Sequence, residues 1–362
     1  MIKAYFWSKK WFGWAYGSGA LLLGCLYAQV HMTVLLNKWR REFFDMFQKI
    51  ESHTLGEFWA SLGHFILIVL CYVFFAVLTA YLTRLYSLRW REAMTFQYIP
   101  RWRAVQEEIE GASQRIQEDT YRFAKIVESL GLQVVNALMT LVAFIPILWG
   151  LSSGLRMPFV PDMPGSLVWA ALTTSIGGMI ISWFVGIKLP DLEYNNQKAE
   201  AALRKELVYG EDNKAKFASL SRLTKLFTSI RVNYHRLFLH YGYFDLWTYV
   251  YGQMMYVVPF LFLGPSVFAG TVTLGVVMQV IDAFSQVHSS FSLFIYNWTT
   301  VTELRSIRRR LREFEANLDK HSPSGREQPD LPAAPKELSL AQKPSRGGGN
   351  IPTPDVAKAL EG

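Results

Sequence analysis

The sequence predicts an all-α integral membrane protein with six transmembrane helices and long cytoplasmic extensions. Six apolar runs of about twenty almost uncharged residues occur along the chain, and each is long enough to cross a hydrocarbon core as an α-helix. Two strongly charged segments with helical periodicity interrupt the series. The composition agrees, because 51% of the residues are hydrophobic and 18% are charged, against roughly 25% charged residues in a soluble domain.

The six spans are identified by their apolar character and by the Trp and Tyr side chains near many of their ends, where interfacial aromatics are expected. Cys25 and Cys71 both lie inside apolar runs, which argues against a disulfide framework. In chain order, we expect the spans at about residues 11–36, 58–81, 126–151, 167–187, 237–263 and 267–298.

The distribution of Lys and Arg predicts the orientation of these spans. Segments 84–125 and 188–236 are rich in basic residues and are expected in the cytoplasm with both termini, whereas the connections at 37–57, after the third run and at 264–266 are expected outside. Residues 1–318 therefore form one transmembrane transport domain. Residues 319–362 turn to Pro, Gly, Ser and Lys and are predicted to be a disordered cytoplasmic tail.

Segments 84–125 and 188–236 extend membrane helices into the cytoplasm, because both keep helical periodicity and have few prolines. Six spans with such extensions between the second and third and between the fourth and fifth are the layout of an ABC-exporter membrane domain. That domain works as a pair, since six helices enclose only half a pathway. The sequence has no G-x-x-x-x-G-K-[ST] loop, so we expect no nucleotide-binding domain within it.

Several function classes are disfavoured by the same residues. The net charge of +8 comes from basic residues that flank apolar runs, so we expect contact with membrane lipids and none with nucleic acid. Neither Gly-x-Ser-x-Gly nor His-Glu-x-x-His occurs, and the seven histidines lack metal-ligand spacing. The sequence therefore predicts a transporter that is not an enzyme and that uses neither a metal nor an organic cofactor.

Five motifs carry a family resemblance. They are RWREAM at 89–94, EGASQRIQEDT at 110–120, GIKLP at 186–190, RKELVYGED at 204–212 and GTVTLG at 270–275. Over about residues 11–319, the chain resembles the SbmA/BacA peptide transporters. The resemblance implies a homodimer in the bacterial inner membrane that imports peptides, including antimicrobial ones, with protons as the coupling ion. It also implies additional N-terminal spans in relatives, so we expect dimer contacts made by those spans to differ.

Glu128 is the first candidate for proton coupling. It lies just inside the third apolar run, where desolvation favours the protonated carboxyl group. The alternative is an interfacial glutamate paired with Lys125 or Arg122. The sequence leaves both interpretations open.

Glu193, Glu200 and Glu211 form a second candidate set, which we call the glutamate stripe. Their separations of 7 and 11 residues place them within about 20° on one helix face, together with Gln197 and Arg204. A solvated, salt-bridged helix would have the same pattern. The family resemblance favours function, because it implies that Glu128, Glu200 and Glu211 line the transport cavity. Gly210 is a candidate helix end, which makes the position of Glu211 the least certain.

The remaining candidates are less specific. Glu118 lies in the longest motif, where a structural ion pair with Arg122 or Lys125 is as good an explanation as proton coupling. Candidates for the substrate cavity are Gln197, Asp245, Asp282, Trp183 and Tyr249. The alternative function is the membrane subunit of an ABC transporter whose ATPase is encoded separately.

Overall fold

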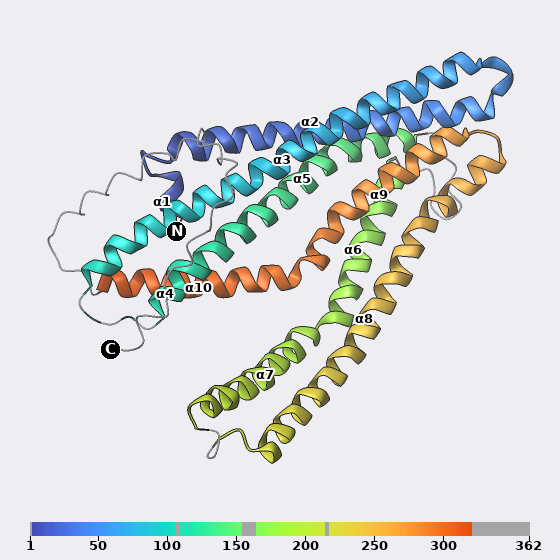
Figure 1. Cartoon of the computed structure of the whole chain (residues 1–362). Helices are drawn as coiled ribbons and strands as arrows, with labels where there is room; N and C mark the ends of the chain where they lie inside the picture. The colour runs from blue at the N-terminus through green and yellow to red at the C-terminus, as the bar shows by residue number, and fades with distance from the viewer. Residues whose placement is uncertain are drawn as a thin grey trace, which may run out of the picture.

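The computed structural model describes residues 2–105, 107, 109, 111–153, 164–213 and 217–320, and these contain helices and no strand (Figure 1). The expected tail from 321 onward lies outside the described residues. The long helices are α2 (Phe12–Gln48), α3 (Leu55–Ala104), α5 (Thr120–Ser152), α6 (Ser166–Gly186), α7 (Leu189–Asp212), α8 (Leu220–Phe268), α9 (Leu274–Tyr296) and α10 (Trp298–Lys320). Shorter elements are α1 (Ile2–Phe6), η1 (Ile50–Ser52), α4 (Ala112–Gln114) and η2 (Arg115–Asp119).

Membrane helices continue far beyond the length of a span, as the charged extensions predict. Helix α3 has 50 residues, which corresponds to about 75 Å at 1.5 Å per residue, more than twice the hydrocarbon thickness. Its N-terminus is capped by Thr54, whose side chain accepts a hydrogen bond from the Glu57 amide. Pro100 lies inside the helix without ending it.

Five helical stretches are long and apolar enough to cross a membrane, one fewer than the six expected spans. The sixth expected span corresponds to α9, which is not among the five. Helix α9 contacts α2, α5, α6 and α8, so much of its surface faces protein. Such a helix does not need to be apolar on every side, and α9 carries Gln279, Asp282 and His288, which lower its hydropathy.

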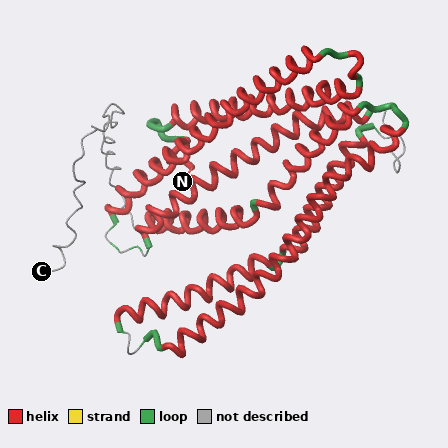
Figure 2. The backbone as a smooth tube through the Cα atoms, turned by 45° about the vertical axis from the view of Figure 1, so that its right-hand side comes forward, coloured by secondary structure: helices red, strands yellow, loops and turns green. Residues whose placement is uncertain are grey.

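The helices form two arms that meet at α9. One arm contains α2, α3 and α5 with α10 against the end of α5, and the other contains α6, α7 and α8 (Figures 1 and 2). Helix α7 packs mainly against α8. There are two buried cores. One cluster around Tyr98, Phe123 and Ile307 joins α3, α5 and α10 within the first arm. The other, around Phe144 and Phe284, joins α5, α6, α8 and α9 where the two arms meet.

Two boundaries differ from the sequence-based prediction. Residues 264–266, expected as an outward connection, lie inside α8, which continues to Phe268. Prolines such as Pro265 are tolerated in membrane helices because neighbouring groups satisfy the freed backbone atoms, and the chain turns only around Gly270, whose φ of 68° favours glycine. Gly210 does not end α7. It is buried where a Cβ would come 2.6 Å from Ala218 Cβ, so close packing explains this glycine.

Candidate functional site

Glu128 lies on the inner face of α5 and is 8% exposed. Its Oε1 is buried and has no hydrogen-bond partner among the described residues. The two cations considered as partners are engaged elsewhere: Lys125 Nζ lies 5.6 Å from the centre of the Tyr121 ring, and Arg122 binds Glu118 and Glu303 at 2.8 and 3.1 Å. Glu128 makes no ion pair within the described part of the chain, and it therefore differs from an ordinary interfacial glutamate.

A cavity of about 400 Å³ adjoins this carboxyl group. Helices α1, α2, α3 and α5 contribute its walls, which are mostly apolar and aromatic. Helix α1 was not predicted, because five residues are too few to give a periodic signal. Its Tyr5 is fully buried and stacks on Trp90 with ring centres 5.8 Å apart.

The glutamate stripe lies on α7, away from Glu128. Glu193 and Glu200 are half-buried and Glu211 is exposed, as are Gln197 and Arg204. Helix α7 lies at the far end of its arm, and α5 runs in the other arm (Figures 1 and 2). One chain therefore does not bring the stripe and Glu128 to the same site.

Glu206 is a buried residue of α7 that the sequence analysis missed. It is 4% exposed, binds Arg222 Nε of α8 at 3.2 Å and accepts a hydrogen bond from the Ala218 amide at 3.1 Å. The sequence holds no signal that separates Glu206 from the other acidic residues of this helix. Its contacts join α7 to Ala218 and to the start of α8.

Asp282 belongs to a polar contact between α2 and α9. Its carboxylate forms an ion pair with Arg40 and accepts a hydrogen bond from Asn37 Nδ2 at 2.8 Å. Near the start of α9, the amides of Leu274 and Gly275 donate to side chains of α2. A polar pocket of about 270 Å³ lies beside the ion pair of Arg40 and Asp282. Its lining includes Gln29, Asn136, Thr140 and Gln286. The pocket contains Asp282 but none of the other predicted site residues.

The other substrate-cavity candidates point outward from the single chain. Tyr249 is 74% exposed and Trp183 is 49% exposed, and Asp245 is exposed on α8. Neither of the two pockets described above for the placed residues contains them. Their side chains are therefore open to contact with lipid or with another protein.

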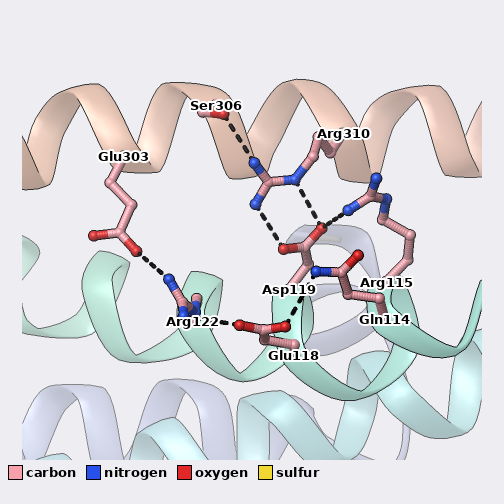
Figure 3. A network of polar contacts seen from close by, with 8 residues as sticks. All are labelled: Gln114, Arg115, Glu118, Asp119, Arg122, Glu303, Ser306 and Arg310. Carbon is pink, nitrogen blue, oxygen red and sulfur yellow. Dashed lines mark hydrogen bonds and ion pairs between the residues drawn. The ribbon is translucent and has the colours of Figure 1, made fainter. Parts of the chain in front are cut away.

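Glu118 belongs to the ionic network shown in Figure 3. Arg122 joins it to Glu303 of α10, which is the structural pairing considered for this residue. The centre of the network is Asp119, whose side chain is 2% exposed and binds Arg310 at 2.7 Å and Arg115 at 2.7 Å. The hydrogen bond to Asp119 raises the pKa of the Arg310 guanidinium above its ordinary value. The network joins the 110–120 motif to α10.

Comparison with known proteins places these features in a family context. The model of the SbmA/BacA-like family matches residues 8–319. The chain is 28% identical over 81% of its length to an inner-membrane ABC transporter ATP-binding protein, YddA, of Escherichia coli (strain K12), and covers 56% of that protein. It is 26% identical over 76% of its length to the chloroplastic ABC transporter D family member 2 of Arabidopsis thaliana, and covers 39% of it. The chain thus spans about half the length of such curated relatives.

Proposed function

The chain belongs to the SbmA/BacA-like family of membrane transporters, which is related to ABC transporter proteins, and on that premise we propose that it imports peptides with protons. In this proposal, two copies form a homodimer in the bacterial inner membrane, with both termini in the cytoplasm. The dimer alternates between outward-open and inward-open states and carries peptides, including antimicrobial ones. The membrane-spanning helices and the family support a transporter, and the coupling to protons rests on the site.

The observation that carries proton coupling is the environment of Glu128. A buried carboxylate without a partner costs several kcal/mol, so a group with no ion pair inside the described structure is suited to bind a proton when its surroundings close. Intramembrane carboxyl groups are typical proton carriers. A pH difference of one unit supplies about 1.4 kcal/mol for each proton that moves down the gradient.

The homodimer is supported by the separation of the candidate site residues within a single chain. The glutamate stripe on α7 and Glu128 on α5 belong to different arms of the chain (Figure 1). Large aromatic side chains such as Trp183 of α6 and Tyr249 of α8 are exposed. A second copy would enclose the other half of the pathway. The glutamate stripe of one copy would then face the arm of the other copy that contains Glu128. The carboxylates would then attract cationic peptides from a distance.

A second candidate function follows from the Escherichia coli relative, which is an ABC transporter ATP-binding protein. In that case the chain is the membrane part of an ABC transporter and a separate ATPase drives it. The sequence itself has no phosphate-binding loop of the G-x-x-x-x-G-K-[ST] type.

Uptake by purified protein separates these two functions. The chain is reconstituted into liposomes, an inward pH gradient is imposed without ATP, and uptake of a fluorescent cationic peptide is measured for the wild type and for Glu128→Gln. Proton coupling predicts uptake that depends on the gradient and is lost in the variant. Uptake that appears only after an ATPase partner and ATP are added would establish the ABC function.

A further inference from the structure

The cavity beside Glu128 combines aromatic walls with a single carboxyl group. Phe6 of α1, Tyr16 of α2, and Tyr86 and Trp90 of α3 contribute rings to its lining. Contacts between the rings hold them in place. The centre of the Phe6 ring lies 5.4 Å from that of Trp90, in an edge-to-face arrangement, and 6.0 Å from that of Tyr16. The lining is therefore preorganised by contacts among three helices, α1, α2 and α3.

Glu128 is the one carboxylic acid and the one charged residue among those that line this cavity. The residue is more than nine-tenths buried, and in the part of the chain that the structure describes Oε1 has no hydrogen-bond partner. A carboxylate in such a site lacks the donor that buried charges normally have. The cavity volume of about 400 Å³ leaves room for a ligand that brings its own donor.

We propose that this cavity binds an alkylammonium group, and that the physiological ligand is a lysine side chain of the transported peptide. An ammonium group supplies three N–H donors and a positive charge to Glu128. Aromatic faces attract the same cation, and the apolar walls accommodate the methylene chain. Neutral and anionic ligands lack this match to the carboxylate.

Two glycines provide the space. A Cβ placed on Gly19 of α2 or on Gly131 of α5 would meet nothing within 4 Å, and both glycines line the cavity. Larger side chains there would occupy the volume without a clash at the Cβ. Gly131→Leu therefore offers a way to block the cavity while Glu128 remains in place.

This inference rests on the proposed function, in which Glu128 also carries a proton. A proton and an ammonium group compete for the same carboxylate, so protonation of Glu128 would release the lysine. The competition predicts that binding of the alkylammonium ion weakens as the pH falls. The proposed homodimer has two such residues, so one Glu128 holds the lysine while the other carries the proton inward.

Binding of hexylammonium to the full chain tests the proposal. The protein is placed in nanodiscs made of phosphatidylcholine and phosphatidylglycerol, which have no primary amine, and titrated calorimetrically with hexylammonium and with the neutral control 1-hexanol. We expect saturable binding of hexylammonium alone, weakened about tenfold or more in Glu128→Gln through loss of a charged partner. Gly131→Leu should abolish binding, and Glu51→Gln, which removes an exposed carboxylate, should leave it unchanged.

Further titrations identify the source of the ammonium group. A short lysine peptide should compete with hexylammonium, whereas its Nε-acetylated form should not. Competition by phosphatidylethanolamine in the nanodisc, without competition by the peptide, would assign the cavity to a lipid headgroup and overturn the lysine proposal. Absence of saturable binding, equal binding of hexanol, or full binding in Glu128→Gln would also overturn it. Gradient-driven uptake that persists in Gly131→Leu would refute the cavity ligand and leave proton-coupled import intact.

Discussion

Removal of Arg310 should destabilise the junction between α10 and the 110–120 motif far more than removal of a neighbouring arginine. Asp119 accepts hydrogen bonds from Arg310 Nη2 at 2.7 Å, from Arg310 Nε at 3.0 Å and from Arg115 Nη1 at 2.7 Å. Arg310→Ala removes two of these and leaves the carboxylate buried with one partner (Figure 3).

The magnitude follows from these contacts. Each hydrogen bond to a charged group contributes about 1.5–3 kcal/mol, so two of them give roughly 3–6 kcal/mol. The Arg310 side chain is 35% exposed, and water will replace part of the lost interaction. We therefore expect Arg310→Ala to lower the free energy of unfolding by about 2–3 kcal/mol.

Arg309→Ala is the matched control. Arg309 pairs with Glu313 at 2.9 Å, and both side chains are well exposed, so its removal should cost less than about 1 kcal/mol. Unfolding in mixed micelles of mild detergent and dodecyl sulfate measures both variants. Equal destabilisation by the two substitutions would refute the reasoning. A double variant Asp119→Asn with Arg310→Ala should be less destabilised than the sum of its single variants, since the two residues share one interaction.

Three further outcomes follow from the packing. Glu206→Ala removes the partner of Arg222 and should increase amide hydrogen exchange in α7 and at the start of α8, at a cost of about 1–3 kcal/mol. Gly178→Ala should lower the melting temperature, because its Cβ would come 2.0 Å from Tyr251, whereas Gly177→Ala, which meets nothing within 4 Å, should not. Asp282→Asn should widen the spin-label distance distribution between α2 and α9, since it weakens their ion pair; an unchanged distribution would show that the pair does not hold these helices.

The helices were largely predictable because each lipid-facing span must be apolar along its whole length. Helix α9 gave the weakest signal because its polar residues face other helices, and its neighbours cannot be known before the fold is known. The turn near Gly270 was misplaced to 264–266 because glycine and proline mark turns in water, whereas membrane helices tolerate both.

The candidate site was predictable to the extent that a residue stood out from its local sequence. Glu128 interrupts an apolar run, and this single feature led to a carboxyl group whose Oε1 is buried with no hydrogen-bond partner in the described structure. Glu206 lies in a segment full of charges, so nothing in its surroundings distinguishes it. The pairing of Asp119 with Arg310 joins residues 191 positions apart, and no local pattern contains that contact.

The measurement that tests proton coupling most directly is proton entry triggered by peptide. Liposomes that contain the purified chain and an internal pH-sensitive dye are held at an inward pH gradient, and a cationic peptide is added outside without ATP. The account predicts that the peptide accelerates internal acidification in the wild type and in Glu51→Gln, but not in Glu128→Gln. Peptide uptake without proton entry, or acidification by Glu128→Gln as fast as by the wild type, would contradict it.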